Sequence, residues 1–424
     1  MAPVSRRAAL AFLASAALPL PAYAARKDDP HAALRGSLQT LVDEGRIPGA
    51  VLLVGRGGRI LHHTVVGWQD VAARTPMRRD TIFRFYSMSK PITSIAIMAL
   101  VDQGKLKLDD PVERTLPELA DLRVYSGGGL ADMQTVPAAR SITIADLLTH
   151  RSGIIYHFTG AGPVQQYYRA HGVMRDTPVG RLPTDAPPAP NLTELVRRIG
   201  QAPLLHQPGA QFVYSYSTTV LGAVIERVTG ERLDVALDRL VFAPLRMKDT
   251  GFFITEGRLG RFVTNYVATP GGLQAIETPA QSDYRDLNRL LDGGGALAGT
   301  ADDYYRFGRM VAGRGAIGRR RILSPALMAE TLATHATVDG MGPRPFQFGY
   351  GFQRGDAASE AAGQLPNGAV GWSGSGNTYF WVDPQTDGIV VFMTQVLTPP
   401  GFEALSLRLR EAIMGPALKL IGEA

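Results

Sequence analysis

A serine and a lysine are spaced so that one can activate the other. Ser87 and Lys90 stand three residues apart at the start of a segment, residues 87–104, whose apolar residues recur with a helical period. Three residues are nearly one helical turn, so both side chains share one face of the helix and can meet. Apolar surroundings disfavour the charged form of Lys90 and make its amine a candidate base. The spacing predicts Ser87 as a nucleophile and Lys90 as its base, with a solvated surface lysine as the alternative.

The start of this helix also suits a reaction at a carbonyl group. The amide of Ser87 and the positive end of the helix dipole would lie beside the reacting group. Pro91 fits the first turn, where its missing N–H costs little. Lys90 is also the one lysine of the chain that follows a serine by three residues. The segment is therefore typical of a serine nucleophile at a helix N-terminus.

Other catalytic layouts are absent from the sequence. There is no G-x-S-x-G, so a nucleophile elbow of the α/β-hydrolase kind is not expected. No histidines occur in H-E-x-x-H or another metal spacing, and we expect no metal and no cofactor. His150, in the segment LLTHRSG at residues 147–153, is interpreted as a structural side chain that makes loop hydrogen bonds.

Composition narrows the classes of function. The chain has 424 residues, 45% of them apolar, enough for one large domain or two closely joined ones. Cysteine is absent, which excludes disulfides, thiolate catalysis and Cys-ligated metal sites. The net charge of +6 is spread along the chain, so neither nucleic acid nor an anionic membrane is the expected partner. A small molecule is the expected partner, and the sequence leaves the oligomeric state open.

The first residues are typical of an export signal. Arg6 and Arg7 form a basic n-region, residues 8–20 an apolar h-region, and Ala22 and Ala24 an A-x-A cleavage site. The apolar run is too short to span a bilayer, so stable membrane insertion is not expected. The pair of arginines also resembles a twin-arginine signal. We predict a signal peptide over residues 1–24 and an exported, periplasmic protein, with an uncleaved N-terminus as the alternative.

Strand patterns lie near both ends of the chain and helical patterns lie between them. The sequence predicts helices at 33–44, 193–200, 218–230 and 402–413, and strands at 50–55, 59–66, 378–382 and 388–394. Strands at both ends favour an α+β fold with one antiparallel sheet built from the two ends of the chain. We expect an α/β part at about 25–110 and 290–424 and a mainly helical part at about 111–289.

Six motifs follow one another in the order of a known family. They are Phe83-Arg84 with Ser87-x-x-Lys90-Pro91, GKLKLDDP at 104–111, LLTHRSG at 147–153, Pro208-Gly209 with Tyr214-Ser215, GGG at 293–295 with TADDY at 300–304, and WSG at 372–374 leading into 380–384. With these motifs the chain resembles the serine β-lactamase-like hydrolases, which include class C β-lactamases, D-alanyl-D-alanine carboxypeptidases and, most similar, family VIII carboxylesterases. The resemblance covers nearly all of residues 25–424. It implies a β-lactamase/transpeptidase-like fold, in which helices flank an antiparallel sheet and a helical insertion domain lies alongside.

The resemblance also implies the rest of the site. Tyr214 would be the second general base, its phenolate form favoured by a positive Lys90 nearby. The oxyanion hole would consist of the backbone amides of Ser87 and Ser375. The substrate pocket would be formed by Trp372, Ser373, Gly374, Tyr216 and Tyr156.

Two motifs depart from the β-lactamase pattern. Tyr216 stands where the second motif of β-lactamases has Asn, and Trp372 where the third motif has Lys. Without that lysine an anionic substrate would lose a charge-assisted contact worth roughly 1.5–3 kcal/mol. We therefore expect an acyl-enzyme on Ser87 and neutral, short-chain carboxylic esters as substrates. A β-lactamase, a D-amino-acid peptidase or amidase, an acyltransferase, and a non-catalytic penicillin-binding sensor are the alternatives.

Overall fold

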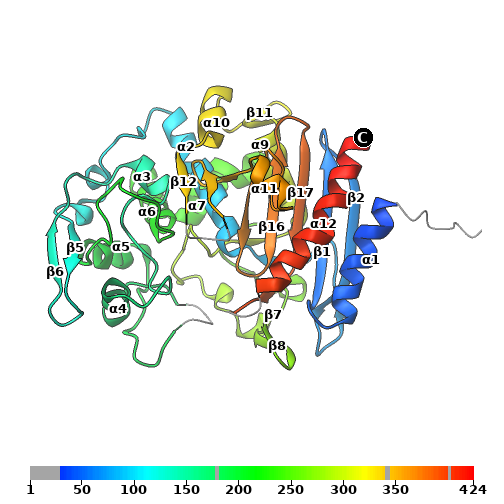
Figure 1. Ribbon diagram of the computed structural model, residues 1–424, viewed down its shortest axis with the longest axis horizontal. Helices are drawn as coiled ribbons and strands as arrows, with labels where there is room; N and C mark the ends of the chain where they lie inside the picture. Colours follow the sequence, from blue (N-terminus) through cyan, green and yellow to red (C-terminus); the bar gives the residue numbers. More distant parts are fainter. Residues whose placement is uncertain (1–28, 177–180, 340–343, 400–402) are drawn as a thin grey trace, which may run out of the picture.

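A nine-stranded antiparallel sheet, made from both ends of the chain, organises the molecule (Figure 1). The computed structural model describes residues 29–176, 181–339, 344–399 and 403–424. The signal peptide predicted for residues 1–24 lies outside them. The strands, in order across the sheet, are β12 (Ala336–Val338), β13 (Phe346–Phe348), β14 (Gln353–Arg354), β15 (Val370–Gly374), β16 (Thr378–Asp383), β17 (Gly388–Met393), β1 (Gly49–Arg56), β2 (Arg59–Asp70) and β3 (Thr75–Pro76).

The two ends of the chain join where β1 pairs with β17. Val51 lies opposite Met393 and Arg56 opposite Gly388, which fixes the antiparallel register. Both strands are almost continuously apolar and almost fully buried, as expected for strands covered on both faces. The strands predicted near both ends of the chain are confirmed, and they form the antiparallel pairs β1–β2 and β16–β17.

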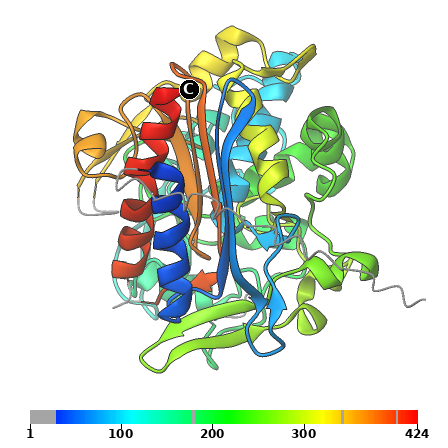
Figure 2. The same ribbon diagram turned by 90° about the vertical axis from the view of Figure 1, so that its right-hand side faces the viewer.

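Helices cover both faces of the sheet. On one face α1 (Pro30–Asp43) lies beside α12 (Glu403–Glu423), as Figures 1 and 2 both show. Leu34, Leu38 and Leu41 of α1 pack there in the same apolar cluster as Ile413 of α12. On the other face α2 (Ser89–Asp102) and α9 (Ala301–Ala312) pack into the larger core. These layers confirm the predicted α+β fold.

The middle of the chain forms a region beside the sheet, at the left of Figure 1. It contains α3 (Ile144–Leu148), α4 (Pro163–Ala170), α5 (Leu192–Gln201), α6 (Ser217–Thr229), α7 (Leu233–Leu237) and α8 (Ala243–Leu245). The middle of the chain also forms two hairpins: β5 (Arg123–Gly127) with β6 (Gln134–Pro137), at the far left of Figure 1, and β7 (Asn265–Thr269) with β8 (Gly272–Glu277), which lies below the sheet. α6 packs against both α2 and α3, which ties this region to the helix after Ser87.

The remaining elements are short. They are β4 (Phe83–Arg84) paired with β9 (Ala298–Gly299), β10 (Ala316–Ile317) paired with β11 (Arg320–Arg321), β18 (Val396–Leu397) parallel to β7, and the helices α10 (Pro325–Leu332) and α11 (Ala357–Ala361). The β4–β9 pair lies directly before Ser87 in the chain and holds it against the segment that follows the GGG motif. Several predicted boundaries were wrong: the first helix begins at Pro30 rather than 33, the second strand continues past 66 to Asp70, the helix predicted from 87 begins at Ser89, and the last helix continues past 413 to Glu423.

Candidate active site

Ser87 and Lys90 are brought together as the spacing predicts, although by a different local structure. Ser87 lies in a 3-10 turn, Tyr86–Met88, and Lys90 lies in the first turn of α2. The Lys90 Nζ donates a hydrogen bond to the Ser87 Oγ over 3.3 Å. The Lys90 side chain is almost fully buried, so the solvated-lysine alternative is wrong.

The turn that carries Ser87 is strained. Tyr86 has a φ of 48°, a left-handed conformation that costs a non-glycine residue about 1–2 kcal/mol. The buried Tyr86 hydroxyl accepts a hydrogen bond from Asn265 Nδ2 at 2.7 Å, which anchors the residue in that conformation. Burial raises the pKa of Tyr86, so its hydroxyl stays neutral. Strain of this kind is frequent at functional sites and here aims the next residue, Ser87, into the cavity.

A loop from the GGG motif holds the Lys90 amine in place. The Lys90 Nζ donates to the backbone carbonyl of Gly294 at 2.7 Å. The Asp292 carboxylate in turn accepts from the Gly294 N–H at 2.7 Å and from the Thr219 hydroxyl at 2.6 Å, and it forms an ion pair with Arg175 at 2.9 Å. Sequence reasoning matched the glycines but missed Asp292, whose signal was a carboxylate directly before them.

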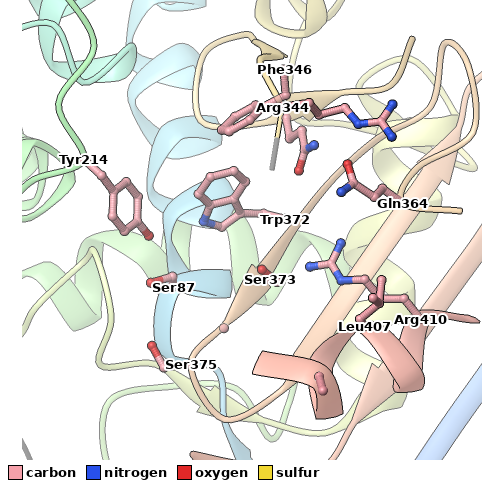
Figure 3. A pocket seen from close by; sticks show the side chains of 13 residues that line it. Ser87, Tyr214, Arg344, Phe346, Gln364, Trp372, Ser373, Ser375, Leu407 and Arg410 are labelled. Atoms are coloured by element: carbon pink, nitrogen blue, oxygen red, sulfur yellow. The ribbon is translucent and has the colours of Figure 1, made fainter. Parts of the chain in front are cut away.

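Tyr214 lies over the lysine, as the resemblance implies. The Lys90 Nζ is 4.6 Å from the centre of the Tyr214 ring, a cation–π distance. In Figure 3 the Tyr214 hydroxyl points toward Ser87. The hydrogen bonds between described residues include none from this hydroxyl to Lys90 or Ser87. Catalytic hydrogen bonds of free enzymes often form only once substrate is bound, so the geometry remains compatible with proton exchange.

The His150 ring packs against the Tyr214 ring. The centres of the two rings are 4.9 Å apart, and the His150 Nδ1 lies 3.1 Å from the Ser215 hydroxyl. Burial first, and the nearby Lys90 charge second, hold the pKa of His150 well below its usual value. A buried neutral ring that hydrogen-bonds a loop matches the structural interpretation of His150.

Tyr156 and Tyr216 were expected in the pocket but lie one layer behind it. Their ring centres are 4.4 Å apart, both side chains are buried, and neither is among the residues that line the cavity. The Tyr216 hydroxyl lies 2.9 Å from the His157 Nδ1. Burial lowers the pKa of His157 to about 4, so its ring is neutral near pH 7 and Nδ1 can accept a hydrogen bond from the phenol O–H. Tyr156 packs edge to face on Tyr214 at 5.5 Å, so it contributes to the site through that ring.

A cavity of about 550 Å³ opens in front of Ser87, within the range of small-molecule sites (Figure 3). Its wall includes Trp372, Ser373 and Gly374, as expected, and also Phe346. The cavity lies between the end of β15 and the beginning of α12, and Ser87 is the lining residue from the N-terminal part of the chain.

The predicted oxyanion hole borders this cavity. Ser87 and Ser375 both line it, and within the described part of the chain neither of their amides donates a loop hydrogen bond. A Cβ atom on Gly374 would lie 2.2 Å from the backbone carbonyl oxygen of Phe85, so only glycine lets β15 come this close to the turn before Ser87. Two free amides beside a serine hydroxyl are the arrangement that stabilises a tetrahedral oxyanion.

Two arginines in the cavity wall were missed by sequence reasoning. Arg344 and Arg410 both line it, the second from α12. Arg410 packs over the Tyr379 ring, 5.6 Å from its centre, and no described carboxylate pairs with it. The premise that the pocket lacks a cation is therefore wrong. Both arginines lie outside the third motif, at positions that no motif marks, so the sequence did not reveal them.

Throughout the described ranges, no group of three or more His, Asp or Glu side chains is placed to hold a metal ion. No described helix is long and apolar enough to cross a membrane.

Several known proteins are similar to this chain in sequence or in fold. A sequence profile described as Beta-lactamase matches residues 34–413. Esterase EstB of Burkholderia gladioli is 32% identical over 392 residues, 87% of this chain and 91% of that protein. Protein Rv1367c of Mycobacterium tuberculosis is 33% identical over 372 residues, 85% and 89% of the two chains. The structure of EstCE1, a hydrolase with promiscuous acyltransferase activity, superposes with a TM-score of 0.75 at 30% identity, covering 91% of this chain and 99% of that one. The chain belongs to the β-lactamase family.

Proposed function

We propose that the protein is a carboxylesterase that forms an acyl-enzyme on Ser87. The observation that carries this proposal is the 3.3 Å contact between the Lys90 Nζ and the Ser87 Oγ at a cavity lined by Ser87 and Tyr214. The relatives EstB and EstCE1, described as an esterase and a hydrolase, support the same reaction class.

The proposed cycle has two halves. Ser87 loses its proton to the Lys90–Tyr214 pair and its oxygen attacks the ester carbonyl. The oxyanion is held by the amides of Ser87 and Ser375. The bond to the alkoxy oxygen then breaks, and the same pair returns the proton to the departing alcohol. Water repeats these steps on the acyl-enzyme and releases the acid.

Acyl transfer to an alcohol is the second candidate. EstCE1 combines hydrolase and acyltransferase activity, and the same acyl-enzyme would serve both reactions. Product analysis with an added short alcohol separates them: a new ester indicates transfer, and acid alone indicates hydrolysis.

The experiment that tests the nucleophile compares Ser87→Ala with Ser126→Ala, an exposed serine on the β5–β6 hairpin far from α2. We expect Ser87→Ala to lose hydrolysis of p-nitrophenyl butyrate while its circular dichroism spectrum is retained, and Ser126→Ala to keep full activity. Intact mass after a slow substrate should show the acyl adduct on the unmodified chain and on Ser126→Ala, but not on Ser87→Ala. Full activity of Ser87→Ala would end the proposal.

The substrate class is tested with an ester panel. We propose neutral, short-chain esters, supported by the apolar rings of Trp372 and Phe346 in the wall. Arg410 offers a contact to an anionic substrate, so the panel pairs each neutral ester with one that carries a terminal carboxylate, and nitrocefin is run beside them. A higher kcat/KM for the carboxylate esters would contradict the neutral class, and nitrocefin turnover rivalling that of esters would favour a β-lactamase.

We also propose export to the periplasm, supported by the basic and apolar pattern of residues 6–20 and by Ala22 and Ala24. N-terminal sequencing of the protein from a bacterial periplasmic extract should begin at Ala25. A chain that stays in the cytoplasm and begins at residue 1 or 2 would contradict it.

A further inference from the structure

The indole N–H of Trp372 is buried and has no hydrogen-bond partner. The side chain is 8% exposed, and its Nε1 is among the buried polar atoms of the described chain that lack a partner. Leaving a buried donor unpaired costs free energy, so native structures rarely do so without a reason. Of these unpaired atoms, the Trp372 Nε1 belongs to the one residue that lines the cavity in front of Ser87.

The position of the indole is fixed by its surroundings. Trp372 lies in β15, opposite Phe380 of β16, and its ring packs against Phe348 with 5.2 Å between centres. Tyr214 lies on another side, 5.7 Å away between ring centres. In Figure 3 the nitrogen edge of the indole is turned toward the Tyr214 hydroxyl and Ser87. The unpaired donor therefore faces the place where the reaction occurs.

Different groups around Ser87 would contact the carbonyl oxygen and the alkoxy oxygen of the ester. The carbonyl oxygen is the one that the amides of Ser87 and Ser375 would bind, and in Figure 3 Ser375 lies on the far side of Ser87 from Tyr214. The alkoxy oxygen must come within reach of the Tyr214 hydroxyl, because that group returns the proton to it. The Trp372 N–H is turned toward the same place.

We propose that the Trp372 N–H donates a hydrogen bond to the leaving alkoxy oxygen of the ester, which makes Trp372 a catalytic residue. This inference rests on the proposed esterase function. As the tetrahedral intermediate collapses, the bond from carbon to the alkoxy oxygen breaks and its electron pair goes to that oxygen. The proton that neutralises the alkoxide comes from the Tyr214–Lys90 pair, while the indole proton stays on nitrogen. The bond strengthens as charge develops on the oxygen, so it stabilises the transition state more than the bound ester.

The test is the dependence of kcat/KM on the leaving group. Trp372→Phe removes the N–H and keeps an aromatic ring. It is assayed on butyrate esters whose alcohols range from p-nitrophenol through phenol to ethanol. p-Nitrophenolate is stable without help, whereas an alkoxide needs stabilisation. We therefore expect a loss of roughly ten- to hundredfold for the ethyl ester and less than about threefold for the p-nitrophenyl ester.

The matched control is Trp381→Phe. Trp381 is also buried with an unpaired Nε1, but it packs in the cluster under α1 and α12, on the other face of the sheet. Its variant should show the leaving-group dependence of the unmodified protein. Because the result is a ratio between substrates on one preparation, a reduced folded fraction does not alter it. Trp372→Leu, which also lacks the N–H, must give the same ratio as Trp372→Phe.

Equal losses on all esters, or no loss, would overturn the inference. An equal loss together with a shifted pH–rate profile would assign the N–H to the Tyr214 oxygen instead. Failure of the proposed function is distinguishable from either outcome, because there Ser87→Ala keeps its activity on the same esters.

Discussion

Asp292 offers a sharp test of how the site is held together. Its carboxylate is 1% exposed and accepts hydrogen bonds from the Gly294 N–H and the Thr219 hydroxyl, while its charge pairs with Arg175, which is 18% exposed. In Asp292→Ala all three partners lose their acceptor, and the Arg175 charge stays in a poorly hydrated place. Breaking a buried ion pair from one side costs about 3–5 kcal/mol of stability. We expect that loss in the free energy of unfolding measured by urea titration.

Asp292→Ala should also lower the rate of the reaction. The Gly294 carbonyl accepts the hydrogen bond of the Lys90 Nζ, and Asp292 fixes the Gly294 amide. A shift of about 1 Å in the position of a catalytic group can cost roughly a hundredfold in rate. We therefore expect kcat/KM for p-nitrophenyl butyrate, per folded molecule, to fall by about ten- to hundredfold. Asp292→Asn keeps an acceptor for the Gly294 N–H, so its kcat/KM should lie between that of the unmodified protein and that of Asp292→Ala.

Asp286→Ala is the control variant for both the urea titration and the kcat/KM measurement. Asp286→Ala removes an exposed carboxylate from the same loop region, whose one described contact is the Asn288 amide, and should stay within about 0.5 kcal/mol of the unmodified protein. If Asp292→Ala matched Asp286→Ala in stability, the buried network would be wrong. If stability fell while kcat/KM per folded molecule did not, the link from Asp292 to Lys90 would be wrong.

Two further predictions concern packing and pH. Gly374→Ala places a Cβ 2.2 Å from the Phe85 carbonyl oxygen, so we expect it to push β15 away from the Ser87 turn and to lower kcat/KM by more than about tenfold. Gly415→Ala is the control, because its Cβ would meet open space, and it should keep its activity. Equal activity of the two variants would contradict this prediction. The pKa of His157 is lowered to about 4 by burial, so the unfolded chain binds a proton below about pH 6.5 that the folded chain refuses until about pH 4. Stability should fall as pH falls through that window, by up to about 1.4 kcal/mol per pH unit, and His157→Gln should have a smaller slope in urea titrations from pH 7 to pH 4; an unchanged slope would show that His157 does not carry the effect.

Much of the fold could be predicted because its signals are local. Apolar strand patterns on either side of a turn indicate the pairs β1–β2 and β16–β17, and antiparallel pairing follows from the short connection. The boundary of α2 was missed because the strained turn at Tyr86 depends on Asn265, a residue that lies far away in sequence. Local patterns predict where elements lie and not which distant contacts alter their ends.

The site divides in the same way. Ser87 and Lys90 meet because three residues along one turn bring any two side chains together, so their spacing alone determined the pair. The acceptor of the Lys90 amine, Gly294, lies 204 residues away, and its anchor Asp292 belongs to no motif we could interpret. Arg410 reaches the cavity only because α12 packs across the end of β15. Contacts of this kind are chosen by packing among many compatible pairs, so the order of residues does not reveal them.

Pocket walls show the distinction most clearly. The sequence by itself determined that Tyr156, Tyr216 and Trp372 are large aromatic residues near a catalytic motif. The tertiary structure decided that the two tyrosines are buried behind Tyr214 and that Trp372 turns its N–H toward Ser87. The physical reason is that side-chain orientation depends on the rings packed around it. Around Trp372 these rings are Tyr214, from the segment before α6, and Phe346 and Phe348 of β13, none of them a neighbour in the chain.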